Sequence, residues 1–299
     1  MSFMSDISIS ADFQGFCKNL KISDSVVSNI QSRYHAITKR VNIDYWNSES
    51  NILHSRYVGS YGRGTCIYTS DIDIVVELPW SEFSRYDNYS GNGQSALLAA
   101  LRNCLQKTYS TSYISADGQV VDIEFSDGVK FEVVPAFRYP DGSGYCYPDT
   151  NNGGNWRSMD PKSEIDSFNG RNSICNGNLK RLCQMLRVWK AKHTVLMSGI
   201  LLDTTAYRFL VDYEYADKSY TYYDLMSRDY FKYLLDNADK VYWDKPGNTG
   251  TVKREYSIKG DAQHAYNKSC EALDDYSKGY GYCWHEDWRE IYGTKFPEA

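Results

Sequence analysis

Two aspartates, Asp71 and Asp73, stand one residue apart within the segment SDIDIVVELP at residues 70–79. Side chains two positions apart on an extended strand point to the same face of a sheet. Carboxylates held this close repel each other unless a positive charge lies between them. Their oxygen atoms are hard ligands of the kind that Mg²⁺ prefers. The spacing therefore predicts a strand whose polar face binds a divalent cation.

A Gly-Ser pair lies upstream of the two acids, with ten residues between Ser60 and Asp71. A glycine at Gly59 allows backbone N–H groups to approach a phosphate closely. A phosphate-binding turn beside paired carboxylates predicts chemistry on a substrate that carries phosphate. The alternative is a simple hairpin whose acids face solvent and have no chemical role.

The residues that alternate with the acids predict how this strand is held in place. They are all apolar and would point away from the acids into a core: Ile72, Ile74, Val76 and Leu78.

The strand register predicted for residues 112–139 identifies a third carboxylate that could bind the cation. A two-residue turn at 127–128 would pair Ile123 with Glu132 and mix apolar and charged groups on both faces. A three-residue turn at 126–128, with its glycine in the left-handed conformation, instead pairs Asp122 with Glu132. We expect this second register, which makes Glu132 the third metal ligand and Asp122 its main rival. An ion pair with Lys130 is the alternative role for Glu132.

The remaining elements are predicted from hydrophobic periodicity. A long helix over residues 25–46, capped by Asp24, is expected to act as a spine that spans two lobes. Residues 140–156 are rich in Gly, Asn and Pro and are predicted to form a surface loop. Further helices are predicted over residues 7–20, 94–109, 178–193, 198–210, 222–238, 261–279 and 284–292.

Composition favours an intracellular enzyme. The 299 residues suffice for two lobes. The net charge of −5 and the absence of a basic run argue against any requirement for DNA or RNA. The eight cysteines form no C-x-x-C pair, which predicts free thiols in a reducing, cytoplasmic compartment. The histidines lack zinc-ligand spacing, and no segment is apolar enough to span a membrane.

At this level of detail the sequence resembles the cGAS/DncV-like nucleotidyltransferases, within the polymerase-beta-like superfamily. These are bacterial cyclic-oligonucleotide synthases of the anti-phage defence systems called CBASS. The motifs that carry the resemblance are VGSYGRGT at 58–65, SDIDIVVELP at 70–79, KFEVVPAF at 130–137, YPDTNNGGNWRSMDPKSEI at 147–165, LCQMLRVWKAKHTVLMSG at 182–199 and WREIYGTKFP at 288–297.

The resemblance implies an α+β fold with two lobes, a mixed catalytic sheet and a helical C-terminal lobe, spanned by the long N-terminal helix. Residues 1–155 would form the nucleotidyltransferase lobe, including that helix. Residues 156–299 would form the helical lobe that closes the nucleotide cleft.

The resemblance also assigns roles to residues. Asp71, Asp73 and Glu132 would be catalytic and would hold two Mg²⁺ ions, for which Mn²⁺ could substitute. The residues that would bind the triphosphate are Gly59, Ser60, Arg187 and Ser198, with Lys190 a further candidate on the same helix as Arg187. The alternatives are a solvated helix face for Arg187 and Lys190, and a helix N-cap for Ser198.

The implied activity is synthesis of a cyclic di- or oligonucleotide from nucleoside triphosphates, with ATP and GTP as the expected substrates. The product, and not direct contact, would act on an effector protein. Activity is expected to be constitutive or switched by a regulatory protein or a metabolite. One alternative is a nucleotidyltransferase that extends a linear acceptor or modifies a protein or small molecule. A non-catalytic nucleotide-binding module is another, although all three acids are present. The bases, the ring size and the linkages are left open.

Overall fold

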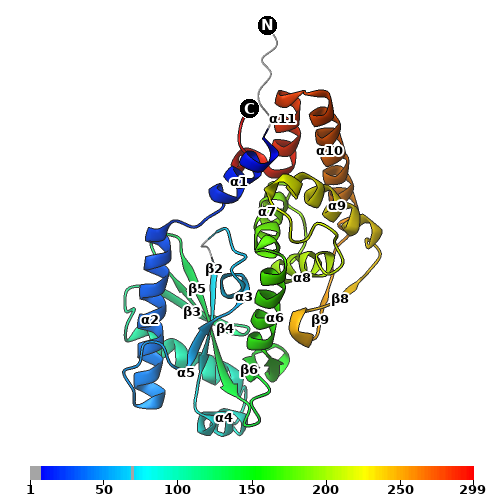
Figure 1. Cartoon of the computed structure of the whole chain (residues 1–299). Helices are drawn as coiled ribbons and strands as arrows, with labels where there is room; N and C mark the ends of the chain where they lie inside the picture. Colours follow the sequence, from blue (N-terminus) through cyan, green and yellow to red (C-terminus); the bar gives the residue numbers. More distant parts are fainter. Residues whose placement is uncertain (1–7, 69–70) are drawn as a thin grey trace. The chain divides into compact units, whose positions relative to one another are not determined.

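The structure, a computed structural model, describes residues 8–68 and 71–299 (Figure 1). These residues form two compact units. The sheet unit comprises Ile22–Gly64 and, apart from residues 69–70, Tyr68–Ile165. The helical unit comprises residues 8–21, Thr65–Ile67 and Asp166–Ala299. The N-terminal residues 8–21 thus pack with the C-terminal helices, whereas the division into functional lobes at residue 155 stays a prediction.

Within the described residues, the sheet unit is built on a seven-stranded sheet in the order β1-β2-β5-β4-β3, with β6 and β7 continuing from β5. The β2 and β5 strands pair in parallel, while the other neighbours are antiparallel. The expected mixed sheet is therefore confirmed. The strands are β1 (Ser55–Tyr57), β2 (Asp71–Glu77), β3 (Tyr113–Asp117), β4 (Val120–Glu124), β5 (Lys130–Arg138), β6 (Tyr145–Asp149) and β7 (Asn155–Met159).

The register predicted for the turn between β4 and β5 is confirmed. Asp122 pairs with Glu132, and Ile123 pairs with Phe131. Gly128 has a φ of +84°, the left-handed conformation that this three-residue turn requires. The Gly128 N–H donates to the Phe125 carbonyl at 3.0 Å and closes the turn.

The core of the sheet unit lies between the sheet and two helices, α2 (Asp24–Trp46) and α5 (Gly93–Gln106). As predicted, the apolar residues of β2 are buried, with Ile72, Ile74 and Val76 all fully inaccessible. Ile30 and Ile37 of α2 enter the same cluster. The N-cap of α2 is Ser23, so Asp24 lies in the first turn and is not the predicted cap.

The prediction of a surface loop over residues 140–156 is wrong. This segment contains β6 and the start of β7, which pair with each other, and β6 also pairs with β5. Tyr145 and Cys146 are buried, and Tyr145 packs with Val75 and Ala136 in a small second core. Turn glycines on both sides of these short strands dominate the composition and obscure the side-chain alternation that is typical of a strand. A short helix, α4 (Trp80–Asp87), was also not predicted.

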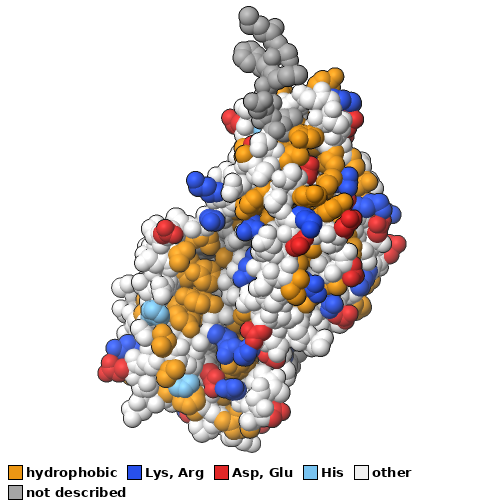
Figure 2. All heavy atoms as spheres, viewed as in Figure 1, with side chains coloured by type: hydrophobic (Ala, Val, Ile, Leu, Met, Phe, Trp, Pro, Cys, Tyr) orange, Lys and Arg blue, Asp and Glu red, His pale blue; other side chains and the backbone are white. Residues whose placement is uncertain are grey.

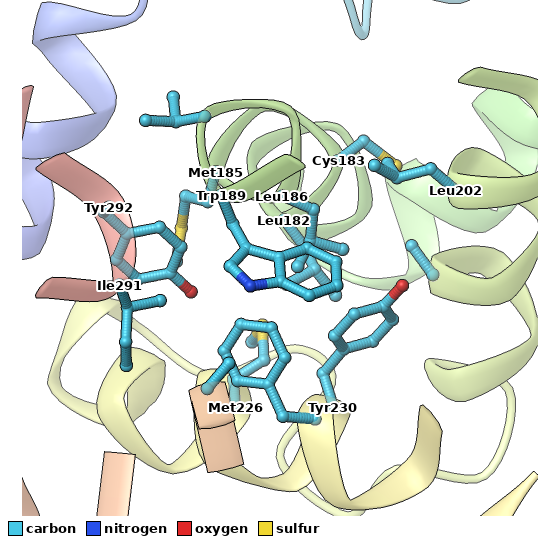
Figure 3. Packing of buried hydrophobic residues seen from close by; sticks show 14 of the residues in the cluster. Leu182, Cys183, Met185, Leu186, Trp189, Leu202, Met226, Tyr230, Ile291 and Tyr292 are labelled. Carbon is cyan, nitrogen blue, oxygen red and sulfur yellow. The ribbon is translucent and has the colours of Figure 1, made fainter. Parts of the chain in front are cut away.

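The helical unit encloses a large core in which Trp189 of α7 is fully buried (Figure 3). Side chains of α9, including Met226 and Tyr230, and of α11, including Ile291 and Tyr292, surround the indole. The helices are α1 (Ile9–Asn19), α6 (Pro161–Ile174), α7 (Asn178–Lys192), α8 (Gly199–Phe209), α9 (Tyr223–Asp236), α10 (Lys259–Lys278) and α11 (Gly281–Tyr292). Shorter elements are β8 (Tyr242–Asp244) with β9 (Thr251–Lys253) and the 3-10 turns Asn151–Gly153, Tyr220–Tyr222, Pro246–Asn248 and Gly293–Lys295.

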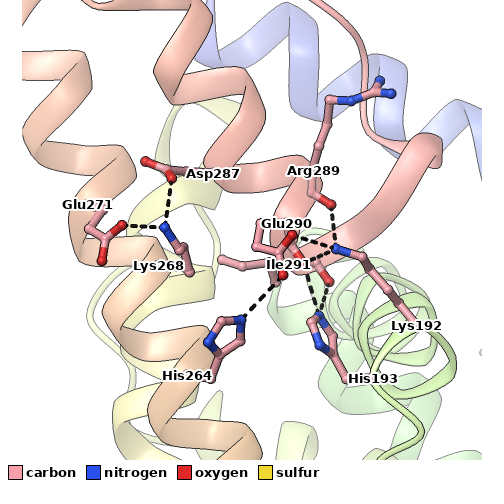
Figure 4. A network of polar contacts seen from close by, with 9 residues as sticks. All are labelled: Lys192, His193, His264, Lys268, Glu271, Asp287, Arg289, Glu290 and Ile291. Carbon is pink, nitrogen blue, oxygen red and sulfur yellow. Dashed lines mark hydrogen bonds and ion pairs between the residues drawn. The ribbon is translucent and has the colours of Figure 1, made fainter.

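Basic side chains at the C-terminal end of α7 form hydrogen bonds with the C-terminal end of α11 (Figure 4). Lys192 donates to the carbonyls of Arg289 and Glu290, and His193 lies 3.0 Å from the Glu290 carbonyl. Basic groups are favourable here because helix C-terminal carbonyls lack partners and carry partial negative charge. This contact holds the predicted helical C-terminal part together. Among the residues described, none of the helices has the length and apolar character to cross a membrane.

Candidate active site

The parallel register of β2 and β5 brings the predicted acids together on one face of the sheet. Asp73 is directly opposite Glu132, and Asp71 is opposite Lys130. On the other side of β5, Asp122 of β4 is opposite Glu132. Glu124 of β4 is opposite Lys130, so three neighbouring strands present one ammonium group and five carboxylates on this polar face, those of Asp71, Asp73, Glu132, Asp122 and Glu124.

Asp73 carries the clearest electrostatic signature of this face. Burial, followed by the charge of Glu132 and a hydrogen bond with it, raises the pKa of Asp73 from 3.8 to about 6. The positive charge of Arg63 lowers this pKa and only partly offsets the rise. The Asp73 carboxyl group therefore holds a proton more readily than an ordinary aspartate does.

Gly59 lies against the Asp73 carboxylate. Its φ is +58°, and a Cβ atom at this position would lie 1.9 Å from Asp73 Oδ2. Only glycine fits such a close approach. The segment predicted as a tight, glycine-rich turn forms a short helix, α3 (Gly59–Arg63), which begins at this contact. Gly59 thus lies next to Asp73 and Ser60 follows it in α3, while the phosphate-binding role of both residues stays a prediction.

Lys130 lies between two of the acids. Its Nζ atom is 3.1 Å from Asp122 Oδ2 and 2.9 Å from Glu132 Oε1. Burial lowers the pKa of Lys130, but its hydrogen bonds to Glu132 and Asp122 outweigh this and raise the pKa above the usual value. The ion pair considered as an alternative for Glu132 is therefore present, and it coexists with the pairing of Glu132 and Asp73.

This face fits a divalent cation through the chemistry of its donor atoms and not through a preformed coordination site. As the described residues stand, no group of three or more His, Cys, Asp or Glu side chains is placed to hold a metal ion. The donors are nevertheless all carboxylates, which suit Mg²⁺ or Mn²⁺. The Asp122 Oδ1 atom is buried without a hydrogen-bond partner in the described structure, and the negative charge of Glu132 adds to the effect of burial in raising the pKa of Asp73. The donor set therefore fits a hard cation, and Lys130 already neutralises part of it.

Arg63 is a residue of this site to which sequence reasoning assigned no role. Its side chain is buried and lies 2.6 Å from Glu164 Oε1, at the start of α6. It is the basic group whose charge acts on Asp73. Its position in the VGSYGRGT motif, four residues after Gly59, was the available signal.

Arg187, a predicted phosphate ligand, forms a two-pronged ion pair inside the helical unit. Both terminal nitrogen atoms bind the fully buried carboxylate of Asp203, one of them at 3.0 Å. Thr65 donates to the same carboxylate at 2.8 Å and is itself fully buried. Arg187 thus helps to fix Thr65, which follows the Gly59–Arg63 helix by two residues.

Lys190 and Ser198, the other candidates in the helical unit, line one pocket of about 300 Å³ together with Lys253 and Tyr256. The Ser198 hydroxyl accepts a hydrogen bond from the Leu201 N–H, so Ser198 is the N-cap of α8, as its alternative role stated. A helix N-terminus beside lysine side chains favours an anion.

Comparison with known proteins places this geometry in context. A family model described as the Second Messenger Oligonucleotide or Dinucleotide Synthetase domain matches residues 7–172, which include the carboxylates of this face. A probable cyclic nucleotide synthase of Bacillus cereus (strain VD146) is 25% identical over 179 residues, covering 56% of this chain. The matched region is 51% of that relative, so the match spans about half of its length.

Two solved structures share the fold. Escherichia coli MS115-1 CdnC with ATP gives a TM-score of 0.69 at 13% identity, covering 96% of this chain and 98% of that one. The CdnC:HORMA-deltaN complex from the same source gives 0.71 at 11% identity, with the same coverage of 96% and 98%. At these identities the likeness concerns the fold, and it confirms the two-part α+β architecture that the sequence indicated.

Proposed function

Because the chain belongs to the family of Second Messenger Oligonucleotide or Dinucleotide Synthetases, we propose that it is a nucleotidyltransferase that joins nucleoside triphosphates into a cyclic di- or oligonucleotide. The observation that carries this proposal is the pairing of Asp73 with Glu132 across two parallel strands, with Gly59 against Asp73. Paired carboxylates next to the N-terminus of a helix that begins with glycine can act on one triphosphate from two sides.

The chain's own residues would divide the work. The backbone at Gly59 and Ser60 would hold the phosphates of the donor. Asp71, Asp73 and Glu132 would orient the acceptor hydroxyl and hold Mg²⁺ or Mn²⁺, which would neutralise charge on the triphosphate. Since the pKa of Asp73 is raised to about 6, its carboxylate could also receive the proton that the acceptor loses.

The pocket of the helical unit is proposed to bind phosphate. Lys253 also lines it but pairs with Glu255 of the same pocket at 2.8 Å, so the charge of Lys190 and the α8 N-terminus at Ser198 are the features that favour an anion. Arg187 would contribute indirectly, because its guanidinium group binds Asp203.

The substrates and partners are proposed from the family and the relatives. We propose ATP and GTP as substrates, in line with a neighbour of known structure that was solved with ATP. A regulatory protein is a further proposed partner, since another neighbour was solved in complex with HORMA-deltaN. The product would act as a cytoplasmic signal in anti-phage defence.

The test is product analysis. Purified protein is incubated with all four nucleoside triphosphates and Mg²⁺, and the products are treated with phosphatase and, separately, with nuclease P1. The proposal predicts a phosphatase-resistant product, since a ring has no terminal phosphate. A product that loses a terminal phosphate on phosphatase treatment but keeps its phosphodiester linkage would instead support transfer to a linear acceptor.

A further inference from the structure

On the polar face that carries the carboxylates, which we call the acidic face, a row of side chains in contact with one another runs across three strands. Asp122 of β4 binds Lys130 of β5, Lys130 binds Glu132, and Glu132 hydrogen-bonds to Asp73 of β2. The row thus places a fixed positive charge directly beside a carboxylate that the proposed function needs as a metal ligand.

Backbone register builds this row. Lys130 and Glu132 are two residues apart on β5 and point to the same face. Asp122 is opposite Glu132 in the antiparallel pair, so it reaches Lys130 on a diagonal. All three side chains are largely shielded, with exposed fractions of 27% for Lys130, 29% for Glu132 and 18% for Asp122. The ammonium group therefore cannot exchange these partners for water freely.

We propose that Lys130 is a built-in competitor of the divalent cation for the Glu132 carboxylate, and that it sets the metal concentration at which the site fills. This inference rests on the proposed function, because it assumes that Asp71, Asp73 and Glu132 hold the metal ion. Without metal, Lys130 neutralises Glu132 and Asp122 and limits repulsion on the face. When a metal ion binds, Glu132 must either contact the ion and the Lys130 ammonium group together or give up the ammonium group for the ion.

Two physical effects act in the same direction. The Lys130 charge repels an incoming cation across a few ångströms of poorly solvated space. Its hydrogen bond to Glu132 Oε1 must also be weakened before that oxygen can turn to the metal. Asp122 reduces both effects, because it shares the ammonium group with Glu132. Removing the charge of Lys130 should therefore tighten metal binding.

The experiment measures Mn²⁺ binding without nucleotide, following free Mn²⁺ by electron paramagnetic resonance. The variants are K130M, K130Q, K130R and D71N/D73N, with the wild type in parallel. We expect K130M and K130Q to bind Mn²⁺ about fivefold or more tightly than the wild type at pH 7.5 and low salt. K130R should stay near the wild type because it keeps the positive charge. K130Q retains a polar side chain, so it guards against a folding defect in K130M.

A matched control is K107M, since Lys107 pairs with Asp44 at 2.6 Å and not with any acid of the site. It should leave Mn²⁺ affinity unchanged. A second readout is the melting temperature in EDTA, which should fall in K130M and then rise more steeply with Mn²⁺ than in the wild type.

The outcomes separate the two ideas. Unchanged or weaker Mn²⁺ binding in both K130M and K130Q would overturn the proposed role of Lys130. If D71N/D73N loses Mn²⁺ binding in the same experiment, the metal site itself is still supported. If D71N/D73N binds Mn²⁺ as the wild type does, the metal site itself is overturned, and the role of Lys130 with it.

Discussion

Single side chains of the acidic face differ in what they contribute, although all of them lie close together. Glu132 contacts both Asp73 and Lys130, whereas Asp122 contacts Lys130 alone of these groups. Glu132 is thus the better placed of the two rivals for a metal ion. The order of importance between them can be measured.

We predict that E132Q loses most nucleotidyl transfer, at least about a hundredfold, and needs more Mg²⁺ for what remains, because a ligand is removed. D122N should be milder, within about tenfold of the wild type. Initial rates over a series of Mg²⁺ concentrations check both values. The opposite ranking would assign the ligand role to Asp122.

A second prediction concerns Asp73 and pH. Its folded pKa of about 6 exceeds the ordinary value of 3.8, so the folded state holds a proton that the unfolded state releases. Metal-free stability should therefore decrease as pH rises from about 4 to above 6. D73N mimics the protonated form and should avoid this loss. It should be more stable than the wild type at pH 7.5, by up to about 3 kcal/mol, and gain less at pH 5.

Denaturant unfolding in EDTA at the two pH values measures this difference. A variant that is less stable than the wild type at pH 7.5 would show that the Asp73 carboxylate supports the fold.

The residues of the site were predictable to the extent that local spacing determines them. Asp71 and Asp73 follow from strand alternation, and Glu132 follows from the geometry of one turn. The contacts of Thr65 with Asp203 and of Arg63 with Glu164 could not be predicted, because each joins residues more than a hundred positions apart in the chain. No local periodicity encodes such pairs.

Among the elements, the segment Thr65–Ile67 stands out because it packs with the helical unit, although the chain on both sides of it belongs to the sheet unit. Thr65 donates to Asp203, and the Gln184 side chain donates to the Cys66 carbonyl at 3.4 Å. This segment connects the glycine-led α3 to the strand of Asp71. Its anchoring should affect both.

We predict that T65V lowers the free energy of unfolding by about 1–3 kcal/mol, because buried Asp203 loses a hydrogen bond. It should also reduce kcat, since the chain between α3 and Asp71 loses its anchor. T65S keeps the hydroxyl and should restore both. Thermal unfolding and steady-state kinetics supply the two values.

T204V is the matched control, because the hydroxyl of buried Thr204 has no hydrogen-bond partner in the described structure. It should be neutral or stabilising. If T65V matches T204V in both measurements, the anchor has no energetic role.

Elements with strong periodicity were predicted well, including the helices around Trp189 and the register of β4 and β5. The strands β6 and β7 were missed because each has only five residues and lies next to glycine turns. Their pairing depends on β5, which supplies the edge for β6. A strand that is defined by a distant partner gives little signal of its own.

On the scale of the whole molecule, charge is the property that bears on partners. The net charge is −5, with 33 basic against 38 acidic residues. On the face shown in Figure 2, basic side chains lie interspersed with acidic ones. Binding to a nucleic acid backbone depends on concentrated positive charge and weakens steeply with salt.

We therefore predict that duplex DNA or RNA changes product formation by less than about twofold at near-physiological salt. Rates are compared with and without each duplex. Stimulation of tenfold or more would contradict this and would require basic residues gathered on another face.

The central claim is that the acids of β2 and β5 perform nucleotidyl transfer, and one measurement tests it most directly. Wild type and D71N/D73N are incubated with α-³²P-labelled ATP and GTP in Mg²⁺, and the label that becomes resistant to phosphatase is counted, with circular dichroism to check the fold. We predict resistant label for the wild type and none for the folded double variant. Equal amounts of resistant label from the two proteins would contradict the claim.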